Sequence, residues 1–462
     1  MIATLVYPGF KLEVTDSSLP TVKVEEDTIT VSLNLVKADI EYRLLGELLS
    51  SVFMYPWVEA DGSEDEIRVL AGKYRERAVI DTLKEAVSSL GGLYSMALMT
   101  PLYPLARKAE AVGGLLSRLY VEMNRDPGEK ARVIGFYKRL LDSVEGLEYT
   151  DGFYRISSPE KIKEHKTTAG FSISSFHRSL MNKLAKHAVE RLRGPDIRVS
   201  GEHLRVGSTR FYLKCGSPSE AASEYMECSG KPTCRSGHII SSSILCSCNG
   251  SRVVVKDYAH MGGKWVVFKI MAKPMVEYRV NPRDRLTAEF HAMEKLRGIV
   301  GLVTPVFYEV CTPSQYRAVA IREFLEGSTL RELGEEEEWG KAGRALGTMH
   351  SNDVTLGDAN PGNFLATPAG DTGIVDAEQS HSYTLKTGAW DIVTFLSTSL
   401  FWRIGENLIT SFLEGYAETA PQPREAFELA SRAYSWIGIL PTVPHIYVQS
   451  KRILGKMLSG NS

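Results

Sequence analysis

The sequence predicts an α+β fold, with a mixed, mostly helical N-terminal half that carries β-hairpins and a C-terminal half built from strands and helices. Alternating apolar residues flank Glu26-Asp27, which is typical of an antiparallel hairpin. Apolar residues recur at every fourth position over 176–192, which indicates an amphipathic helix. A β-branched and aromatic run over 264–270 predicts a strand in the second half.

The N-terminal half contains further periodic segments. Four helical patterns are expected, over 40–53, 64–90, 102–124 and 127–144. The run 197–213 predicts a second hairpin. The stretch 216–237 is rich in Ser, Gly and Pro, so it predicts a linker to the second half.

A basic stretch lies at the end of the N-terminal half. Residues 155–198 contain ten Lys or Arg, four acidic residues and three His. Such a stretch can bind RNA, a lipid head group or a phosphorylated substrate. The simpler alternative is a solvated amphipathic helix.

Composition places the chain among ordinary globular proteins. It has 462 residues, 43% of them hydrophobic and 24% charged, which suggests two or three domains. The net charge of −2 gives no general indication of nucleic-acid or membrane binding. No apolar run is long enough for a membrane span, and the N-terminus lacks the pattern of a signal peptide. A cytoplasmic protein is therefore expected.

The chain has six cysteines, and none of them forms a Cys-x-x-Cys pair. A zinc site built from Cys215, Cys228 and Cys234 is conceivable, although these spacings match no standard zinc motif. A disulfide is a second alternative. Free, partly buried thiols are the simplest expectation.

A lysine and a glutamate in the second half form a candidate pair. Lys269 lies near the end of the strand expected over 264–270. A helix is expected over 285–296, because three apolar residues recur at helical spacing: Leu286, Phe290 and Met293. Glu289 lies near this stripe, so it can point inward and hold Lys269. Alternatively, Glu289 is solvated, and Glu294 is the rival candidate for holding Lys269.

Three polar residues near the C-terminal end suggest phosphate chemistry. Asp358 is followed by Asn363 and then by Asp376, which stands at the end of an apolar strand. Phosphoryl transfer needs a carboxylate facing the attacking hydroxyl and oxygen ligands that hold Mg²⁺ against the phosphates. Asp358 fits the first role, and Asn363 and Asp376 fit the second. Taken alone, residues 358–363 also read as a turn, because Asp, Asn, Pro and Gly favour turns.

Together these features resemble the protein-kinase-like superfamily over residues 238–462. The nearest groups are the small atypical kinases of archaea, the RIO kinases, and the lipopolysaccharide and aminoglycoside phosphotransferases. The segment from Lys269 to Glu289, with Tyr278-Arg279-x-x-Pro282, resembles the archaeal group. The resemblance implies a two-lobed catalytic domain, with an N-lobe over 238–327 and a C-lobe over 328–462. Residues 1–215 then form a separate N-terminal domain.

The resemblance also implies roles for single residues. Lys269 would meet the α- and β-phosphates, with Glu289 orienting it. Small residues would replace the glycines of the phosphate loop, at Cys246, Cys248 and Ser251. Ser247 and Val253 are candidate nucleotide-binding residues in that loop. Backbone groups from Glu323 to Leu325 would pair with adenine, and Asp391 would brace the catalytic loop.

The chain departs from the family pattern at several points. Leu356-Gly357-Asp358 lacks the histidine that the family has before its catalytic aspartate, which weakens the packing of that loop. The metal strand ends in Asp376-Ala377-Glu378. The segment from Asp376 to Asp391 is short, which disfavours a peptide-substrate kinase of the eukaryotic type.

The expected function is ATP- and Mg²⁺-dependent transfer of the γ-phosphate to a hydroxyl of an unidentified small-molecule, RNA-associated or protein substrate. The first alternative is a catalytically impaired pseudokinase that acts as a nucleotide-sensing scaffold. The second is a nucleic-acid- or anion-binding module in the N-terminal half. Whether Glu378 replaces or supplements a metal ligand is left open by the sequence.

Overall fold

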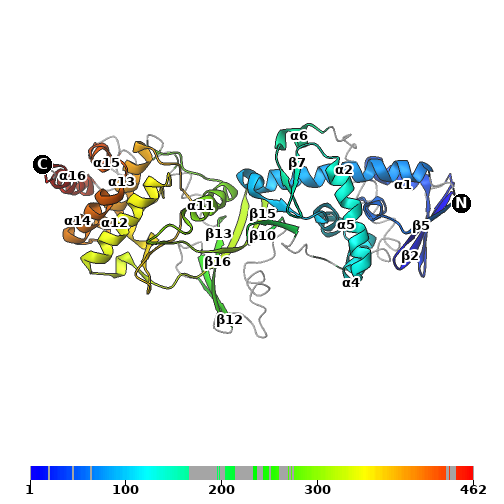
Figure 1. Cartoon of the computed structure of the whole chain (residues 1–462), viewed down its shortest axis with the longest axis horizontal. Coiled ribbons are helices and arrows are strands. Elements are labelled where there is room, and N and C mark those ends of the chain that lie inside the picture. Colours follow the sequence, from blue (N-terminus) through cyan, green and yellow to red (C-terminus); the bar gives the residue numbers. More distant parts are fainter. Residues whose placement is uncertain are drawn as a thin grey trace. The chain divides into compact units, whose positions relative to one another are not determined.

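The computed structural model describes residues 2–18, 21–43, 46–62, 65–165, 195, 197, 203–213, 233–236, 243–248, 251–259, 269, 272, 275–432, 436 and 444–460. The chain divides into two units, Met1–Tyr212 and Leu213–Ser462. Both units contain strands and helices, so the expected α+β class is confirmed for the described residues (Figure 1).

A sheet at the N-terminal end of the first unit has the strand order β3-β4-β2-β1-β5. Its strands are β1 (Ala3–Tyr7), β2 (Phe10–Thr15), β3 (Val22–Glu25), β4 (Thr28–Ser32) and β5 (Glu59–Gly62). The hairpin expected around Glu26-Asp27 is confirmed, because β3 and β4 pair antiparallel with Val24 opposite Ile29.

The helices of the first unit agree only in part with the expected segments. They are α1 (Leu33–Tyr42), η1 (Ser50–Met54), α2 (Asp65–Leu90), η2 (Gly91–Met96), α3 (Tyr103–Val112), α4 (Gly114–Arg125), α5 (Pro127–Asp142) and α6 (Pro159–Glu164). The helix expected over 40–53 is wrong, since α1 ends where Arg43 adopts a left-handed conformation with φ 53°. The pattern over 102–124 is divided at Gly113.

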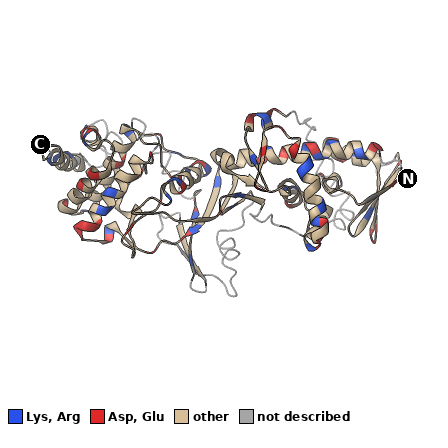
Figure 2. Ribbon diagram, in the orientation of Figure 1, with Lys and Arg blue, Asp and Glu red and all other residues tan. Residues whose placement is uncertain are grey.

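The helices expected over 64–90 and 127–144 are confirmed as α2 and α5. The Asp126 side chain caps α5, since it accepts hydrogen bonds from the N–H groups of Gly128 and Glu129. Lys and Arg residues alternate with Asp and Glu residues along α2 (Figure 2), which is typical of a solvated helix surface.

Five short strands complete the first unit, in the order β10-β9-β6-β8-β7. They are β6 (Leu98–Met99), β7 (Leu147–Thr150), β8 (Phe153–Ile156), β9 (Leu204–Val206) and β10 (Thr209–Tyr212). The pair β9–β10 confirms a hairpin within 197–213. Most of the basic stretch 155–198, including the helix expected over 176–192, lies outside the described residues.

The second unit begins with strands in the order β11-β12-β13-β16-β15. They are β11 (Thr233–Ser236), β12 (Ser243–Cys248), β13 (Ser251–Asp257), β15 (Phe307–Ser314) and β16 (Arg317–Glu323), and helix α11 (Pro282–Leu296) packs against β15 and β16. Most of the linker predicted over 216–237 lies outside the described residues, and its end contains β11. One face of this sheet buries an apolar cluster: Cys246, Val253, Val255, Val319 and Ile321.

The rest of the second unit is mainly helical. A small sheet has the order β14-β19-β18-β17, with β14 (Leu302–Val303), β17 (Ser328–Thr329), β18 (Phe364–Ala366) and β19 (Thr372–Ile374). The helices are η4 (Leu330–Glu332), α12 (Glu336–Ser351), η5 (Pro361–Asn363), α13 (Leu385–Phe401), α14 (Glu406–Thr419), α15 (Pro423–Ala430) and α16 (Pro444–Ser459). No helix among the described residues is long and apolar enough to cross a bilayer.

Helices α12 and α14 lie side by side (Figure 1) because glycines allow their backbones to approach. A Cβ atom on Gly343 would overlap the carbonyl oxygen of Phe412, and one on Gly415 would overlap that of Gly340. This close contact places His350, near the end of α12, next to Tyr416 of α14.

Two of the cysteines are disulfide-bonded, namely Cys246 and Cys311. None of the cysteines whose side chains the structure describes is free. The expectation of free thiols is therefore wrong for these two residues, because sequence spacing does not show which cysteines the fold brings together. Cys215 and Cys228, two members of the conceivable zinc site, lie outside the described residues.

Candidate functional site

A buried lysine–glutamate pair lies between the sheet and the helix of the second unit. Lys256 is on β13, and its Nζ donates a hydrogen bond of 2.7 Å to Glu289 Oε2 on α11. Both side chains are buried. The same Nζ lies 2.5 Å from Asp376 Oδ1, just after β19. Three segments that are far apart in the sequence therefore meet at one ammonium group.

Lys269, the lysine predicted for this pair, is elsewhere. Its side chain is 48% exposed, and its Nζ lies 3.2 Å from Glu277 Oε1. Its backbone is helical, in contrast to the expected strand. The predicted pairing with Glu289 is wrong because the strand that faces Glu289, β13, carries a different lysine, Lys256. Glu289 itself points inward, and its rival Glu294 pairs with Arg297.

Two signals in the sequence favoured Lys256. The run Val253-Val254-Val255-Lys256 has the same Val-Val-x-Lys pattern as 266–269. In addition, Asn249-Gly250 stands between two apolar runs, which is a strong signal of a two-residue hairpin. A hairpin at that position makes the run ending at Lys256 a paired strand.

The phosphate loop predicted around Cys246 and Cys248 is an antiparallel hairpin in which β12 pairs with β13. Cys246 is opposite Val253, and Ser247 is opposite Arg252. Val253 is buried in the apolar cluster of the sheet. Cys246, Ser247, Cys248 and Ser251 therefore belong to regular strand pairs, so the phosphate loop predicted at these residues is wrong.

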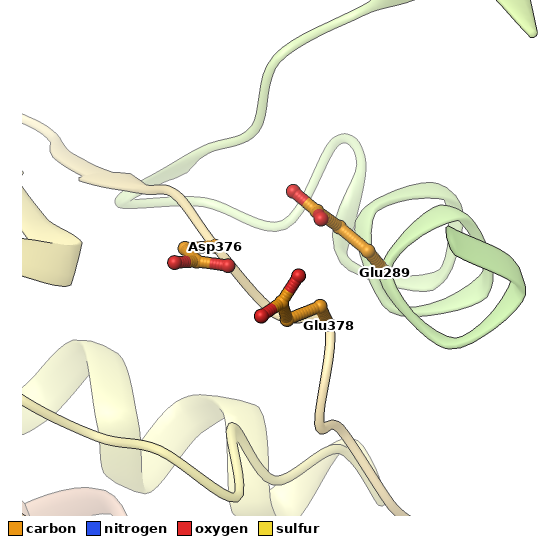
Figure 3. Close-up of side chains that lie close together, drawn as sticks. All are labelled: Glu289, Asp376 and Glu378. Carbon is orange, nitrogen blue, oxygen red and sulfur yellow. The ribbon is translucent and has the colours of Figure 1, made fainter. Parts of the chain in front are cut away.

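The charges around Lys256 balance. Its Nζ is surrounded by the carboxylates of Glu289, Asp376 and Glu378, whose nearest oxygens all lie within 4.8 Å of one another (Figure 3). Arg322 pairs with Glu289, and Arg285 Nη2 lies 2.6 Å from Glu378 Oε2. Three cations thus face three carboxylates. Because the Lys256 ammonium already lies among these carboxylates, they do not form a free cage for a metal ion.

Titration behaviour follows from this arrangement. Burial alone lowers the pKa of Lys256, but the carboxylates of Asp376, Glu289 and Glu378 raise it above its usual range, so the side chain stays charged. Burial raises the pKa of Glu378, while Lys256 and Arg285 oppose that change. Burial and Glu289 raise the pKa of Tyr258, whose hydroxyl donates to Glu289 Oε2 at 2.8 Å.

Asp376 differs from the other two carboxylates. Its side chain is 43% exposed, whereas those of Glu289 and Glu378 are buried. Its backbone has φ 64°, an uncommon left-handed conformation that Asp tolerates better than most residues. One carboxylate of the cluster therefore faces the solvent while it contacts Lys256.

Asn363 lies beside Asp376 because β18 and β19 pair antiparallel, with Phe364 opposite Ile374. The Val375 N–H donates to the carbonyl oxygen of Asn363 at 3.0 Å. The Asn363 side chain is buried, and its Nδ2 donates to the carbonyl oxygen of Asp358 at 2.9 Å. This hydrogen bond orients the amide and leaves Oδ1 as its acceptor group. The oxygens of Asn363 and Asp376 fit the hard ligands that Mg²⁺ prefers.

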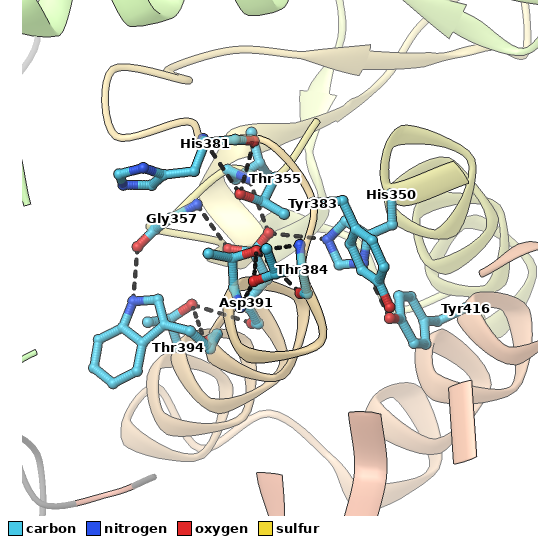
Figure 4. A network of polar contacts seen from close by, with 12 residues as sticks. His350, Thr355, Gly357, His381, Tyr383, Thr384, Asp391, Thr394 and Tyr416 are labelled. Atoms are coloured by element: carbon cyan, nitrogen blue, oxygen red, sulfur yellow. Dashed lines mark hydrogen bonds and ion pairs between the residues drawn. The ribbon is translucent and has the colours of Figure 1, made fainter. Parts of the chain in front are cut away.

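Asp391 holds the backbone just before Asp358 (Figure 4). Its Oδ2 accepts from the Leu356 N–H at 2.8 Å, and its Oδ1 accepts from the Gly357 N–H at 2.7 Å. Gly357 has φ 72°, and a Cβ there would overlap the carbonyl oxygen of Gln379. Only glycine therefore fits this bend, which brings Asp358 to the turn before η5.

Two aromatic side chains hold the other side of the same loop. The hydroxyl of Tyr278 donates to the Gly357 carbonyl oxygen at 2.6 Å, and Trp390 Nε1 donates to it at 2.9 Å. Burial raises the pKa of Tyr278, and the negative charge of Asp358 raises it further. Asp358 is partly buried.

A histidine from another element contacts Asp391, the residue that holds the loop before Asp358. His350 of α12 is buried, and its Nε2 lies 3.0 Å from Asp391 Oδ2 (Figure 4). Its Nδ1 lies 3.0 Å from the hydroxyl of Tyr416. The expectation that the loop lacks histidine support is thus corrected. His350 follows the apolar stripe of α12 in sequence, which was the available signal.

The expected hinge, from Glu323 to Leu325, begins at the last residue of β16. The N–H of Glu323 already donates to the carbonyl oxygen of Val306 at 2.8 Å, so it is not a donor for adenine. Among the described residues, the backbone groups of 324–326 have no hydrogen-bond partner. Arg252 pairs with Glu326 and lies 4.3 Å from the ring centre of Phe324. Leu325 therefore remains a candidate backbone contact.

Comparisons with known proteins show only distant similarity. No family model and no curated protein matches the chain. The aminoglycoside phosphotransferase APH(4)-Ia matches 53% of this chain and 98% of its own, with 9% identity and a TM-score of 0.32. The type VIII aminoglycoside-3'-phosphotransferase matches 52% of this chain and 99% of its own, with 12% identity and a TM-score of 0.31.

A thermostable mutant of APH(4)-Ia, crystallised as a ternary complex with ADP and hygromycin B, is similar to the same extent. It has 8% identity and a TM-score of 0.32, over 53% of this chain and 98% of its own.

Proposed function

We propose that the second unit is an ATP- and Mg²⁺-dependent phosphotransferase of the protein-kinase-like type. The observation that carries this proposal is the position of Lys256 Nζ, 2.7 Å from Glu289 and 2.5 Å from Asp376. A fixed ammonium beside a half-exposed carboxylate provides one group for phosphate oxygens and one for the metal ion that accompanies them.

Each residue of the site has a distinct task in this proposal. Lys256 binds oxygens of the α- and β-phosphates, and Glu289 fixes the direction of its side chain. Asp376 and Asn363 hold Mg²⁺ through carboxylate and amide oxygens. The metal ion neutralises charge on the phosphates when it is bound. Backbone groups near Leu325 pair with the adenine.

Asp358 orients the acceptor hydroxyl and receives its proton. The contacts of the preceding backbone support this role, since Asp391, Tyr278 and Trp390 hold Leu356 and Gly357 from two sides. A general base contributes to rate only when its position is fixed relative to the reacting oxygen. The rigid bend at Gly357 therefore supports Asp358 as the catalytic carboxylate.

The acceptor is a hydroxyl compound that reaches Asp358 without a long docking segment. The chain between β19 and α13 contains only residues 375–384, and these include the ion-paired Glu378 and a bridge from Thr355 to His381. That segment leaves no room for the peptide platform of eukaryotic protein kinases. A small-molecule or RNA-associated hydroxyl fits this site better than an extended peptide.

A thermal-shift titration of the full chain with ATP, with and without Mg²⁺, tests the proposal. A ligand that binds only the folded state stabilises it by about 2.7 kcal/mol at a hundredfold excess over Kd. We expect a shift that requires both ATP and Mg²⁺. No shift with any purine nucleotide at millimolar concentration would contradict the proposed function.

A further inference from the structure

Helix α11 makes two separate contacts with the charged cluster. Arg285 and Glu289 are four residues apart, so they lie on one side of the helix. Glu289 binds Lys256 of β13 and Arg322 of β16. Arg285 Nη2 lies 2.6 Å from Glu378 Oε2, and its Nη1 donates to the Tyr258 carbonyl oxygen at 2.7 Å. The helix is therefore attached to the sheet at one turn and to the segment after Asp376 at the next.

Glu378 is the partner that joins these contacts. It is buried, and its Oε2 lies 2.6 Å from Arg285 and 3.3 Å from Lys256 Nζ. Both of these cations are also buried. A buried carboxylate that faces two buried cations has its charge neutralised by the protein, so a metal ion would have to compete with both.

We propose that Arg285 and Glu378 are positioning residues. Their ion pair, which we call the latch, holds α11 where Glu289 can bind Lys256. Glu378 is accordingly a counter-ion and not a ligand of Mg²⁺. Only the consequence for Mg²⁺ and nucleotide binding rests on the proposed function. The latch itself is a property of the protein without nucleotide.

The latch also explains how Lys256 stays in place when a metal ion binds. Asp376 is the exposed member of the three carboxylates, so it is the one that can turn from Lys256 to a cation. Lys256 then keeps two buried counter-ions, Glu289 and Glu378. Without Glu378, the departure of Asp376 would leave Lys256 with Glu289 alone, which Arg322 already shares.

Hydrogen exchange of the full chain without nucleotide tests the latch. The double variant Arg285→Met/Glu378→Gln removes one charge of each sign, so the buried cluster stays balanced and the fold is retained. Lys295→Met/Asp353→Asn is a matched control, because this pair of 2.8 Å also ties α11 to another segment but is exposed. We expect the amides of α11 to exchange about tenfold faster in the first variant, which corresponds to about 1.4 kcal/mol. The control should exchange like the unaltered protein.

Unchanged exchange in the Arg285/Glu378 variant, or an equal increase in the control, would show that no latch exists. A second arm measures the Mg²⁺ concentration that gives half of the ATP-induced thermal shift. Glu378→Gln should leave this concentration within about twofold, whereas Asp376→Asn should raise it by about tenfold or more. An increase in Glu378→Gln as large as that in Asp376→Asn would make Glu378 a metal ligand and overturn the proposal.

The two arms separate the latch from the proposed function. If the unaltered protein shows no ATP-induced shift, the proposed function is contradicted. The exchange of α11 then still decides for or against the latch, because that arm uses no nucleotide.

Discussion

Lys256 Nζ lies 2.7 Å from Glu289 Oε2, although the two residues are 33 positions apart in the chain. Both side chains are buried, and the pair joins β13 to α11. Breaking a buried ion pair by removing one partner typically costs about 3–5 kcal/mol. Experiments on this site therefore have to separate loss of folding from loss of ligand binding.

The carboxylate of Asp358 is expected to be needed for turnover but not for binding. Asp358→Asn keeps the shape of the side chain and removes the group that receives the hydroxyl proton. We expect ATP hydrolysis or phosphorylation of an acceptor to fall by about 10²-fold or more. Enzyme turnover and the Mg-ATP thermal shift should be measured on the same preparation, and the shift should be retained.

Two results would contradict the proposed role of Asp358 as the catalytic carboxylate. An Asp358→Asn variant as active as the unaltered protein would remove Asp358 from the reaction. Nucleotide binding without any turnover in the unaltered protein, across candidate acceptors, would instead identify a nucleotide-sensing pseudokinase.

Asp391→Asn should loosen the loop that carries Asp358. The two carboxylate oxygens of Asp391 accept hydrogen bonds from Leu356, Gly357 and His350. In the variant, an NH₂ group replaces one of these oxygens and faces a donor. A buried donor left without an acceptor costs about 1–3 kcal/mol. Urea unfolding should show this loss, and kcat should fall more than the affinity for ATP. Unchanged stability together with unchanged kcat would show that this carboxylate does not support the loop.

Gly343→Ala should destabilise the second unit, because the added methyl group would meet the backbone of Phe412 on α14. Overpacking of this kind costs about 1–3 kcal/mol. Gly72→Ala is the matched control, since Gly72 also lies within a helix but has no neighbouring atom within 4 Å of the added Cβ. That control should gain about 0.5–1 kcal/mol from helix propensity. Equal effects of both substitutions on chemical unfolding would contradict the close approach of α12 and α14.

Stability should fall in acid because of His381. Burial, with a smaller effect of Arg279, lowers the pKa of His381 from 6.5 to about 4. Between these values the unfolded chain binds more protons at this residue than the native state, so the free energy of unfolding rises with pH. The contribution is complete above pH 6.5 and is lost as pH falls towards 4. It has an upper limit of about 3 kcal/mol, because the side chain is partly exposed.

Urea unfolding of the unaltered protein and of His381→Gln, from neutral pH to pH 4.5, measures this contribution. The difference in unfolding free energy between the two proteins should change across that range, with the unaltered protein losing more. Parallel pH profiles would show that His381 does not titrate abnormally.

The sequence identified much of the site through residues whose roles depend on local spacing. Asn363 and Asp376 lie side by side because a short hairpin separates them, and the sequence indicated the strand that ends at Asp376. The inward direction of Glu289 followed from the apolar stripe of its own helix. These inferences needed only the periodicity of one or two neighbouring elements.

The errors came from contacts between distant elements. Two Val-Val-x-Lys runs were candidates for the strand whose lysine pairs with Glu289. Only the pairing of β12 with β13 and of β13 with β16 selects Lys256 over Lys269. The contact of His350 with Asp391 depends on the packing of α12, α13 and α14, which no local pattern specifies. The charge balance at Glu378 likewise requires an arginine 93 residues away.

Calorimetric titration with Mg-ATP tests whether Lys256 is the phosphate-binding lysine of a Mg-nucleotide site. The proteins to compare are Lys256→Met, Lys256→Arg and Lys269→Met, each first shown to be folded by its thermal unfolding. We predict that Lys256→Met weakens binding by roughly 30-fold or more, or about 2 kcal/mol. Lys256→Arg, which keeps the charge balance, should also weaken binding, because a guanidinium does not match the contacts of an ammonium. Lys269→Met should bind like the unaltered protein, and a loss of affinity in Lys269→Met with normal affinity in both Lys256 variants would contradict the account.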